Sequence, residues 1–376
     1  MRVLVSGGGT AGHINPALAI ADKIKKEIPD SVIEYVGTPN GMENILVPKA
    51  GYKIHSVKVK GFKRKLTLQN VDALIKAFTS VSEAKKIIKN FKPDIVIGTG
   101  GYVCWPVLKA AAKLGIPTAV HESNAFPGMT TKMLSKYVDK IMISFESTQK
   151  LLECDRRKLV LTGNPVSEKM MNASYEKMRQ KLGVDKDKIV ILSAGGSLGA
   201  KKINEAVYTL VNEYSAKKNN VIHFHATGKA GFEEQALLYK NAGFKQKDEE
   251  TLVKNGVCVK KYIYNMDELL ASADVVICRA GAMTLTEVAL LGKASVIIPS
   301  PYVTDNHQYK NAKVLSDKNA AVLLEEKELS GNTLVQNVRQ LTENKPLRKE
   351  MEKNVKEFAV YDSLDRIYET ISGLVK

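Results

Sequence analysis

The chain has 376 residues, of which 44% are apolar, and it carries a formal net charge of +16. This length favours two domains, and no stretch approaches the ~20 apolar residues that a bilayer-spanning helix needs. The apolar run at residues 1–5 is too short to predict a signal peptide. The cysteines lie far apart without a CxxC pair, which fits reduced thiols in a cytosolic protein better than disulfides or a zinc site. They are Cys104, Cys154, Cys258 and Cys278.

Short apolar runs alternate with helical patterns along the whole chain. In the first half, strands are predicted at 2–6, 32–36, 55–60, 94–98, 117–121, 140–144 and 158–163. In the second half, they are predicted at 188–193, 221–226, 257–261, 274–278, 294–299 and 320–324. Several of these runs are continuous Val/Ile segments, which is typical of strands buried on both faces of a parallel sheet. The helices between them indicate right-handed βαβ units, and therefore an α/β fold.

The two halves of the chain begin alike. One opens with RVLVSGGGTAGHINPALAIADKIKK and the other with KIVILSAGGSLGAKKINEAVYTLVNE, each a strand, a glycine-rich turn and an amphipathic helix. This repetition predicts two doubly wound, Rossmann-like domains with a cleft between them. We place the first domain at 1–165 and the second at 166–345, with a linker near 162–170. Residues 346–376 are predicted to form a closing helix that packs back across the cleft.

The first glycine-rich loop, SGGGTAGHINPALAIA at 6–21, lies between the end of a strand and the start of a helix. Asn15 is a good N-cap and Pro16 a good first helical residue, so the helix is predicted to begin there. Free N–H groups at such a loop favour an anion, most often phosphate. His13 is a candidate general base, because a neutral imidazole can accept a proton from a hydroxyl. It can equally be a residue that only shapes the loop.

The same loop contains GxGxxG, and Glu34 follows about 20 residues later, so a dinucleotide-dependent oxidoreductase is an alternative. Two details count against it. The predicted start of the helix lies beyond the glycine motif rather than inside it. Glu34 also lies in the middle of a predicted strand, where its carboxylate would not reach a ribose.

Further loops with anion- and sugar-binding residue types follow other strands. They are GTGGYVCWP at 98–106, HESNAFPG at 121–128, SAGGSLGA at 193–200, CRAGAMTLTE at 278–287 and PSPYVTDNHQYKNA at 299–312. Open α/β sheets bind ligands at this edge. Glu287 could accept hydrogen bonds from two ribose hydroxyls, or it could only interact with the dipole of its own helix.

Together these loops suit a nucleotide-sugar glycosyltransferase of the GT-B architecture. The other glycosyltransferase architecture holds its donor through a metal bound by Asp-x-Asp. The pair Asp185 and Asp187 has that spacing but lies in a lysine-rich turn, which indicates surface residues. No His, Cys, Asp or Glu cluster has metal-ligand spacing, so we predict no metal and no cofactor.

The motifs GGTAGHINPALAIA, GTGGYV, HESNAFPG, TGNPV, SAGGSLGA, RAGAMTLTE and DNHQYKNA, in this order, resemble the MurG family of peptidoglycan synthesis. The resemblance runs from residue 1 into the 310s. It implies an inverting transfer of N-acetylglucosamine from UDP-GlcNAc to the 4-hydroxyl of the muramoyl sugar in lipid I, an undecaprenyl-diphosphate-linked glycopeptide, which gives lipid II. It also implies a peripheral enzyme at the anionic cytoplasmic side of the cell membrane.

The resemblance also implies roles for individual residues. Donor-site residues carried over by motif are Thr10, Ala11, Gly12, Asn124, Ser197, Ile263, Ala282, Met283, Thr284, Glu287 and Gln308. Among them, Ile263 resembles the residue whose backbone reads uracil, Ala282 to Thr284 the diphosphate turn, and Glu287 the ribose carboxylate. The acceptor diphosphate site is implied for Gly9, His13, Gly100, Gly101 and Tyr102.

Some positions depart from the family pattern. Ser167 stands where an arginine that approaches the donor is common, and Lys169 or Lys201 could substitute for it. Cys104 and Trp105 replace small residues after GGYV. His307 stands where the family has a glutamine, beside the retained Gln308.

The segment 62–90 is strongly basic, since residues 51–92 hold 11 basic and two acidic side chains. Val71, Leu74, Ile75, Phe78 and Val81 follow helical spacing, with Lys63, Arg64 and Lys65 among the basic residues around them. This pattern predicts a helix that rests on anionic lipid through Lys63, Arg64, Lys65, Leu74, Ile75 and Phe78. An ordinary core-facing helix with a solvated back is the alternative.

Three other functions stay open at this point. Another GT-B transferase with a different acceptor is the nearest, and an NAD-dependent oxidoreductase is the most distant. A nucleic-acid-binding protein would explain the net charge of +16. However, aromatic residues make up only 6% of the chain and do not interleave with the basic stretch, so we predict no nucleic-acid partner.

Overall fold

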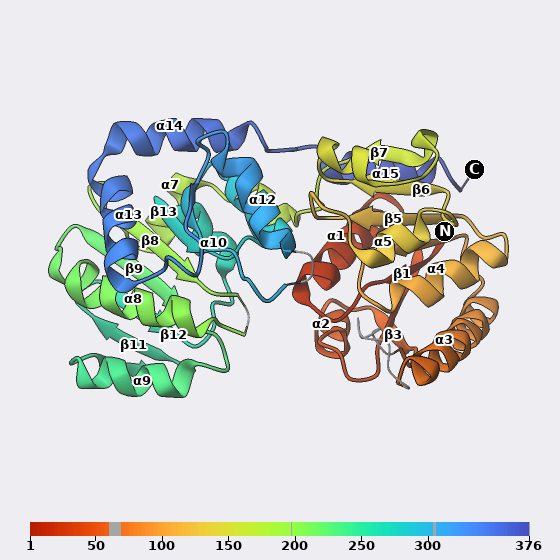
Figure 1. The fold of residues 1–376 in the computed structure, drawn as a ribbon, viewed down its shortest axis with the longest axis horizontal. Coiled ribbons are helices and arrows are strands. Elements are labelled where there is room, and N and C mark those ends of the chain that lie inside the picture. Colours follow the sequence, from red (N-terminus) through yellow and green to blue (C-terminus); the bar gives the residue numbers. More distant parts are fainter. Residues whose placement is uncertain (60–68, 197, 304–305, 376) are drawn as a thin grey trace. The chain divides into compact units, whose positions relative to one another are not determined.

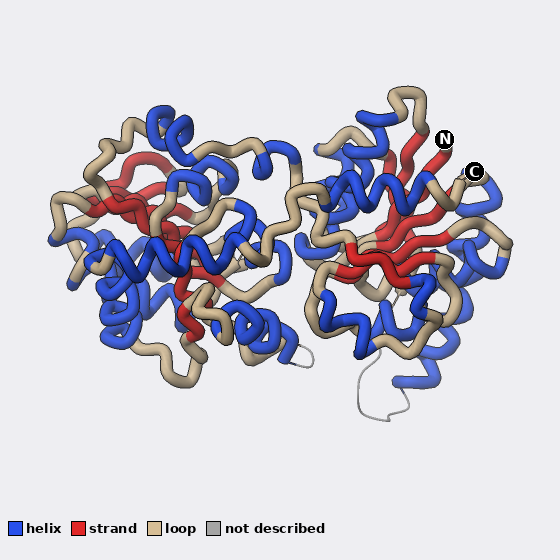
Figure 2. Tube along the Cα trace, turned by 90° about the horizontal axis from the view of Figure 1, so that it is seen from above, coloured by secondary structure: helices blue, strands red, loops and turns tan. Residues whose placement is uncertain are grey.

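The computed structural model describes residues 1–59, 69–196, 198–303 and 306–375, and for 69–78 only the backbone. The chain divides into two compact units. Unit 1 contains Met1–Val166 and Asp362–Lys376, and unit 2 contains Ser167–Tyr361. In each unit, helices cover both faces of a central sheet (Figures 1 and 2).

In unit 1, the described residues form a seven-stranded sheet in the order β3-β2-β1-β4-β5-β6-β7, and every pair is parallel. The strands are β1 (Arg2–Ser6), β2 (Val32–Gly37), β3 (Lys53–Ser56), β4 (Ile95–Gly98), β5 (Thr118–Glu122), β6 (Lys140–Ile143) and β7 (Leu159–Leu161). Most of these strands are buried, as continuous apolar runs predict for a doubly wound sheet.

Alternating residues of the unit 1 strands face two separate cores. Val3 and Val5 pack on one side of β1 against α1, α2 and α15, while Leu4 packs on the other side against α3, α4 and α5. The helices are α1 (Ala11–Glu27), α2 (Glu43–Lys49), α3 (Gln69–Phe91), α4 (Cys104–Lys113), α5 (Met129–Leu134) and α15 (Ser363–Ser372). Two short 3₁₀ helices are η1 (Glu146–Leu151) and η2 (Arg156–Lys158).

In unit 2, the described residues form an eight-stranded sheet in the order β10-β11-β12-β9-β8-β13-β14-β15. The strands are β8 (Ile189–Ala194), β9 (Val221–Ala226), β10 (Lys245–Asp248), β11 (Thr251–Lys254), β12 (Val257–Lys260), β13 (Val275–Cys278), β14 (Ala294–Ile297) and β15 (Val322–Leu323). β10, β11 and β12 pair antiparallel and the other pairs are parallel. β10 and β11 were not predicted, because β10 is an exposed, lysine-rich strand and β11, although partly buried, has only two apolar residues in a row.

The core on one face of this sheet lies under α8 (Lys201–Glu213), α9 (Phe232–Asn241) and α13 (Gly331–Glu343). The remaining helices are α6 (Glu168–Met171), α7 (Tyr175–Lys181), α10 (Met266–Ser272), α11 (Ala282–Leu290), α12 (His307–Ser316), α14 (Lys345–Lys356) and the short η3 (Ser215–Lys217). α13 begins with a capping box, in which the side chains of Ser330 and Thr333 each bond the other's backbone N–H.

Both sheets reverse their strand order at one point. In unit 1, the chain moves outward in one direction from β1 to β2 and β3, and in the other from β4 onward, so β1 and β4 are neighbours at the switch. In unit 2, β8 and β13 are the equivalent neighbours. The crevice beyond the carboxyl ends of such a strand pair is where open α/β sheets bind ligands.

The start of the first helix was predicted wrongly. α1 begins at Ala11, after Thr10 in extended conformation, and not at Asn15 and Pro16. Pro16 has no N–H to donate to the carbonyl four residues before it, but its ring is buried, and this packing favours the longer helix. The helix therefore begins inside the glycine motif, so this argument against a dinucleotide-binding protein fails.

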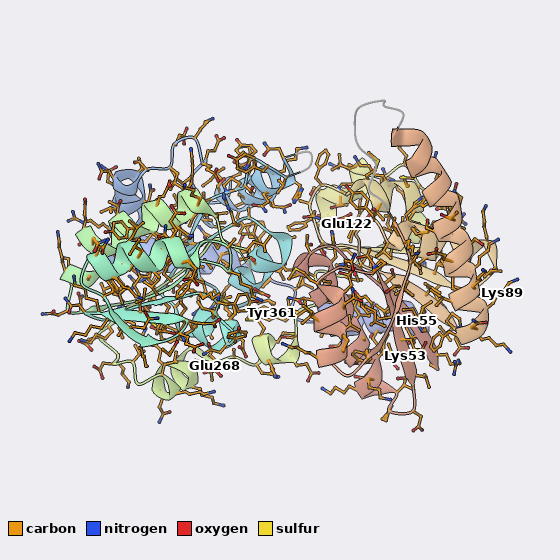
Figure 3. The ribbon with its side chains drawn as sticks, turned by 90° about the horizontal axis from the view of Figure 1, so that it is seen from below. Lys53, His55, Lys89, Glu122, Glu268 and Tyr361 are labelled. Atoms are coloured by element: carbon orange, nitrogen blue, oxygen red, sulfur yellow. The ribbon has the colours of Figure 1, made fainter. Side chains whose placement is uncertain are left out.

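The position of Glu34 remains an argument against that alternative. Its carboxylate lies in the middle of β2 and bonds His55 and Lys53 of β3, both labelled in Figure 3. Burial alone would raise the pKa of this carboxyl, but these two hydrogen-bonded partners hold it below its usual value. A carboxylate engaged in this way does not present its oxygens to a ribose.

The C-terminal segment also differs from the single helix expected at 346–376. It contains two helices, α14 in unit 2 and α15 in unit 1. Met351 belongs to the unit 2 core, whereas Ile367 and Ile371 pack against the α1 face of unit 1. Because the two apolar sets belong to different cores, the helix is interrupted between them. Among the described residues, no helix is both long enough and apolar enough to cross a membrane.

Candidate active site

The two glycine-rich loops of unit 1 follow the neighbouring strands β1 and β4 and are bonded to each other. The N–H of Gly8 donates to the carbonyl of Gly100 (3.3 Å), and the Thr99 hydroxyl donates to the carbonyl of His13 (2.6 Å). A Cβ atom at Gly101 would lie within 3 Å of the Gly8 backbone, so glycine is required for this close approach. The loops therefore act as one unit at the switch point of the sheet.

His13 lies in the first turn of α1 and is half-buried. Its Nδ1 is 3.2 Å from the carbonyl oxygen of Thr99. Since a carbonyl only accepts, Nδ1 carries the proton in this contact, and Nε2 bears the lone pair of the neutral ring. A Cβ atom at Gly100 would lie within 3 Å of the imidazole, so this glycine leaves room for the ring.

The other residues expected at the acceptor site lie on the same loops. Gly9 is exposed with φ +85°, and its N–H donates to the Glu43 carboxylate at 3.3 Å. Gly100 and Gly101 both have positive φ. Tyr102 is 59% exposed, so its ring is available to a ligand or a surface.

Cys104 and Trp105, the two departures from the family pattern, have different surroundings. Cys104 is fully buried, and its thiol donates to the carbonyls of Ser6 and Gly100 at 3.0 and 2.9 Å. Burial raises the pKa of this thiol to about 11, so it stays protonated and joins the two loops as a donor. The Trp105 ring lies beneath the ammonium of Lys109 (4.4 Å).

The loop after β5 is organised by a buried carboxylate. Glu122, labelled in Figure 3, accepts the N–H and side-chain amide of Asn124, each at 3.0 Å, and the N–H of Gly128 at 2.9 Å. It also accepts the Thr131 hydroxyl at 2.6 Å. Glu122 therefore fixes the Asn124 side chain in place. Glu122 itself is buried, whereas Asn124 is half-buried and keeps part of its surface exposed.

In unit 2, the glycine turn after β8 packs against a second turn after β9. Gly196 and Gly199 have φ of +98° and +85°, and a Cβ atom at Gly199 would collide with the Thr227 carbonyl. Ser197, predicted to contact the donor, lies outside the described residues. The turn has the left-handed glycines that an anion-binding loop requires.

The neighbouring switch-point strand, β13, leads into α11, whose first residues are Ala282, Met283 and Thr284. Its N-cap, Gly281, supplies no side-chain cap, so the first N–H groups of this helix have no side-chain acceptor there. Such a helix start favours the negative charge of a diphosphate.

Glu287 lies in the second turn of α11. It keeps part of its exposure, yet protein surrounds it, and this burial, with a smaller contribution from the charge of Asp267, raises its pKa to about 7. Among the described residues, no hydrogen bond or ion pair engages its carboxylate, which argues against a purely structural role in capping or pairing.

Arg279 and Glu326 form a nearly buried ion pair at the start of the β13–α11 turn. The guanidinium Nη2 lies 2.6 Å from the Glu326 Oε2, and Nη1 donates to the Ile298 carbonyl at 3.2 Å. The side chains are 13% and 5% exposed. Together these contacts tie the turn to the ends of β14 and β15.

The remaining predicted donor residues lie around these turns. Gln308 accepts the N–H of Ser300 (2.9 Å) and holds the loop after β14 against the start of α12. The buried Asn311 donates to the Ala280 carbonyl at 3.3 Å. Ile263 is buried, so its side chain anchors the segment whose backbone is predicted to read a base, and the rings of Tyr262 and Tyr264 on either side of it in the chain contact each other at a tilt.

Comparison with known proteins bears on this arrangement of loops. Residues 3–143 match the family model for the glycosyltransferase family 28 N-terminal domain, and residues 190–367 match the model for the C-terminal domain. The UDP-N-acetylglucosamine–N-acetylmuramyl-(pentapeptide) pyrophosphoryl-undecaprenol N-acetylglucosamine transferase of Acetivibrio thermocellus is 44% identical over 376 residues, which cover 100% of this chain and 99% of that one. The protein of the same name from Ruminiclostridium cellulolyticum is 44% identical over 375 residues, with 100% of both chains covered.

The crystal structure of Acinetobacter baumannii MurG is similar with a TM-score of 0.75 at 29% identity, covering 99% of each chain. This chain belongs to the MurG family. It is a GT-B glycosyltransferase with two Rossmann-like domains, as the sequence predicted, and it is of the N-acetylglucosaminyltransferase class.

Ser167, where an arginine is common in the MurG family, caps a short helix. Its hydroxyl accepts the N–H of Met170 at the start of α6. Lys201 lies 3.7 Å from Glu234 in an exposed ion pair. These contacts give Ser167 a local structural role and do not identify which lysine, if either, replaces the arginine.

Three polar residues of these loops were not predicted to act at the site: Glu43, Arg279 and Glu326. All are nearly buried charges. Arg279 stands inside the CRAGAMTLTE motif and could have been noticed there, whereas Glu43 and Glu326 become apparent only when the fold brings them to loops 34 and 47 residues away in the chain.

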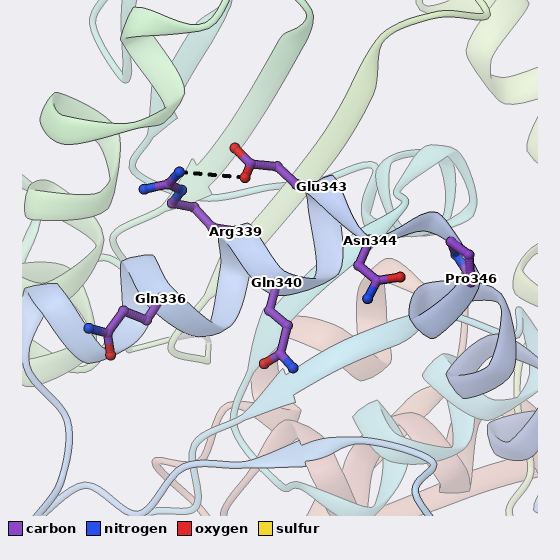
Figure 4. Close-up of a pocket in the computed structure, with 6 residues that line it drawn as sticks. All are labelled: Gln336, Arg339, Gln340, Glu343, Asn344 and Pro346. Carbon is purple, nitrogen blue, oxygen red and sulfur yellow. Dashed lines mark ion pairs between the residues drawn. The ribbon is translucent and has the colours of Figure 1, made fainter.

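Other predicted features carry no ligand-binding geometry. Asp185 and Asp187 are exposed, and within the described part of the chain no group of three His, Cys, Asp or Glu residues could hold a metal. A pocket of about 570 Å³ on α13 and the start of α14, shown in Figure 4, is lined by Gln336, Arg339, Gln340, Glu343, Asn344 and Pro346. None of the predicted site residues lines it.

The predicted membrane contact falls largely outside what the structure describes. Lys63, Arg64 and Lys65 lie outside the described residues, and for Leu74, Ile75 and Phe78 only the helical backbone is described. Further along α3, Ala84, Ile88 and Phe91 are buried in the unit 1 core. This part of α3 therefore has the inward-facing side of an ordinary amphipathic helix.

Proposed function

We propose that this chain transfers N-acetylglucosamine from UDP-GlcNAc to the 4-hydroxyl of the muramoyl sugar in lipid I, giving lipid II with inversion at the transferred sugar. The carrying observation is that polar glycine-rich loops follow both switch-point strands in each unit, β1 with β4 and β8 with β13. The names of the relatives supply the identity of the two substrates.

The donor is proposed to bind unit 2 through the first residues of α11. Ala282, Met283 and Thr284 offer backbone N–H groups to the diphosphate, and Ser197 is assigned a phosphate contact by its motif alone. Glu287 accepts the ribose hydroxyls, a role that its unengaged carboxylate supports. Ile263 is assigned the uracil contact through its backbone.

Other donor contacts are proposed for loop residues of both domains. Gln308 lies at the start of α12, and Asn124 lies on the loop that Glu122 organises. In the first domain, Thr10 is the N-cap of α1 and Ala11 and Gly12 are its first residues, and no acceptor for their N–H groups is found among the described residues. These groups suit hydroxyl or phosphoryl oxygens of a nucleotide sugar.

The acceptor diphosphate is proposed to bind the joined glycine loops, at Gly9, Gly100, Gly101 and Tyr102. His13 is proposed as the general base, which takes the proton of the 4-hydroxyl as that oxygen attacks the anomeric carbon and UDP leaves. Its Nδ1 contact with Thr99 supports this role, because it fixes the tautomer that has the lone pair on Nε2.

We also propose that the first domain rests on the anionic cytoplasmic face of the cell membrane, since a lipid-linked acceptor stays in the bilayer. α3 packs against α4, and α4 packs against α5. A pocket of about 470 Å³ on α4, α5 and the segments that follow α5 mixes lysines with large apolar side chains, as membrane-surface sites do. Its lining includes Trp105, Lys109, Lys132, Met133, Lys136 and Tyr137.

The proposal is tested by ligand-dependent thermal stability. UDP-GlcNAc is expected to raise the melting temperature, whereas NAD and a mixed-sequence oligonucleotide leave it unchanged, because a ligand that binds only the native state stabilises it. Stabilisation by NAD or by the oligonucleotide instead would favour the oxidoreductase or the nucleic-acid-binding alternative. A GT-B transferase with another acceptor would share the UDP-GlcNAc result and is separated from this proposal by turnover with lipid I.

A further inference from the structure

Glu43 is a fully buried carboxylate directly behind the first glycine loop. It is the first residue of α2, its exposure is 0%, and it reaches from the segment after β2 to the loop after β1. A buried charge is costly unless protein groups satisfy it, so its position calls for an explanation. The roles assigned to the loop above leave this residue unused.

Backbone and hydroxyl donors surround the Glu43 carboxylate. Oε1 accepts the N–H and the hydroxyl of Thr38 at 2.8 and 2.7 Å, and Oε2 accepts the N–H of Gly9 at 3.3 Å. Burial would raise the pKa of this carboxyl, but these hydrogen bonds hold it below its usual value. Glu43 is therefore ionised, and its negative charge is stabilised by hydrogen-bond donors from the two loops that it joins.

Three glycines make room for this side chain. A Cβ atom at Gly8, Gly37 or Gly41 would lie within 3 Å of a Glu43 side-chain atom. Gly8 belongs to the glycine loop itself, so one of the glycines that the sequence suggested for ligand binding in fact accommodates Glu43. The loop is shaped around the carboxylate beneath it.

The Glu43 contact also determines which N–H groups the loop offers to a ligand. Since Gly9 donates its N–H inward, the groups without an acceptor among the described residues are those of Thr10, Ala11 and Gly12, at the start of the 17-residue helix α1. Gly9 has φ +85°. Because glycine adopts positive and negative φ about equally readily, the hydrogen bond to Glu43 can select this conformation.

We propose that Glu43 is a positioning residue for the acceptor: by holding the N–H of Gly9 from beneath, it fixes the glycine loop in the shape that binds the acceptor's diphosphate. This inference rests on the proposed function. A loop that is already ordered binds its ligand more tightly, because less conformational entropy is lost on binding.

Glu43→Gln tests the proposal with little change in volume. Whichever way its amide is turned, its NH₂ group faces a donor, either the Gly9 N–H or the Thr38 groups, so the anchor is broken. We expect the KM for a soluble short-chain lipid I analogue to rise at least fivefold, and the KM for UDP-GlcNAc, whose proposed contacts Thr10, Ala11 and Gly12 follow the anchored Gly9, to rise by less. Glu43→Asp keeps the negative charge on a shorter side chain, so its acceptor KM is expected to lie between those of the parent protein and Glu43→Gln.

Glu34→Gln is the matched control, because Glu34 is a carboxylate of the same sheet that bonds His55 and Lys53 rather than the loop. It should leave both KM values within twofold. An unchanged acceptor KM in Glu43→Gln, or a rise confined to the donor KM, overturns the proposal. A fall in the acceptor KM would show that the carboxylate repels the diphosphate, and would also overturn it.

Hydrogen exchange of the ligand-free protein gives a readout independent of turnover. In Glu43→Gln, amides of residues 7–12 should exchange at least tenfold faster, with no comparable change in the turn at 195–200 of unit 2. Equal exchange in the variant and the parent protein contradicts the positioning role. If the parent protein shows no turnover with the acceptor analogue, the proposed function fails, whereas the exchange result still decides whether Glu43 orders the loop.

Discussion

The Nδ1 of His13 lies 3.2 Å from the carbonyl oxygen of Thr99, on the loop that follows the neighbouring strand. This contact joins the two glycine loops of the first domain through the one side chain proposed to move a proton. It sets the tautomer of the ring, since a carbonyl requires an N–H partner. The carbonyl of Thr99, a backbone group, is thus one of the groups that orient the base.

If His13 is the general base, its removal should slow the chemical step without abolishing donor binding. We expect His13→Ala and His13→Gln to lower kcat by ~10²-fold or more, because a glutamine can still donate to Thr99 but cannot accept the proton. UDP binding, measured by calorimetry, should survive in both. Asn15→Ala, an exposed position on the same helix, is the control and should keep kcat within twofold. Near-normal turnover of His13→Ala would remove the residue from the mechanism.

Glu287 is expected to determine donor affinity. A hydrogen bond to a charged group contributes roughly 1.5–3 kcal/mol, so Glu287→Ala should raise the KM for UDP-GlcNAc at least tenfold. An unchanged donor KM would mean that the carboxylate serves only its own helix.

The pH dependence of the donor KM follows from the same carboxylate. Its pKa of about 7 means that it is ionised above pH 7 and protonated below. Since the ionised form is the better acceptor for two hydroxyls, the donor KM should rise as pH falls below 7, by up to tenfold per unit. Glu287→Gln should flatten this rise, and a donor KM that is constant from pH 6 to pH 8 would contradict the assignment.

The Arg279–Glu326 pair is expected to hold the diphosphate turn. Removing one partner of a buried pair leaves the other charge unpaired, so Arg279→Met should lower the free energy of unfolding by about 3 kcal/mol and raise the donor KM. Arg279→Met combined with Glu326→Leu should recover stability, because no buried charge remains, but not donor affinity. Recovery of both would show that the pair serves folding alone.

Two buried histidines in unit 2 should make stability depend on pH. His223 and His225 share the Ser193 hydroxyl, each at 2.8 Å, and burial lowers their pKa values to about 3 and about 4. In the unfolded chain they take up protons below about pH 6.5, while the folded protein keeps them neutral. Stability is therefore complete above pH 6.5 and declines as the pH falls below it.

Each histidine can contribute up to about 1.4 kcal/mol per pH unit to this decline. We expect urea unfolding to show a falling free energy between pH 6.5 and 5, and His223→Gln to have a shallower slope. The parent and the variant having the same slope would contradict the assignment.

Membrane docking through the basic segment should be separable from catalysis. Reversing Lys63, Arg64 and Lys65 to Glu should weaken salt-sensitive binding to vesicles with acidic phospholipid, since each basic residue near such a surface adds ~1 kcal/mol. It should also slow turnover of membrane-embedded lipid I while sparing a soluble analogue. Reversal of Lys240, Lys245 and Lys247 in unit 2 is the charge-matched control. Equal losses on both acceptors would contradict docking through this patch.

The sequence predicted the parallel sheets well because their strands are continuous apolar runs, and β10 and β11 were missed because neither of these short antiparallel strands contains such a run. The start of α1 was misplaced because Pro16 and Asn15 are strong local signals that tertiary burial of the proline overrides. Local sequence patterns therefore predict which helices and strands form, whereas the residues at which they begin and end depend on tertiary packing.

At the candidate site, the position of the loops next to the strands could be predicted, because a parallel sheet brings the carboxyl ends of its strands to one edge. The charges that support those loops were not. Glu43 lies 34 residues from Gly9, and Glu326 lies 47 residues from Arg279, and nothing in a single sequence pairs them. Gly8 illustrates the difference, since it looks like a ligand-binding glycine yet leaves room for Glu43.

Turnover of the purified full-length chain with UDP-GlcNAc and a soluble lipid I analogue tests the central claim most directly. The account predicts a product one N-acetylglucosamine heavier than the acceptor, joined through the 4-hydroxyl of the muramoyl sugar in inverted configuration, with release of UDP. Transfer to a different hydroxyl, retention of configuration, or UDP-GlcNAc binding without transfer to this acceptor would contradict it.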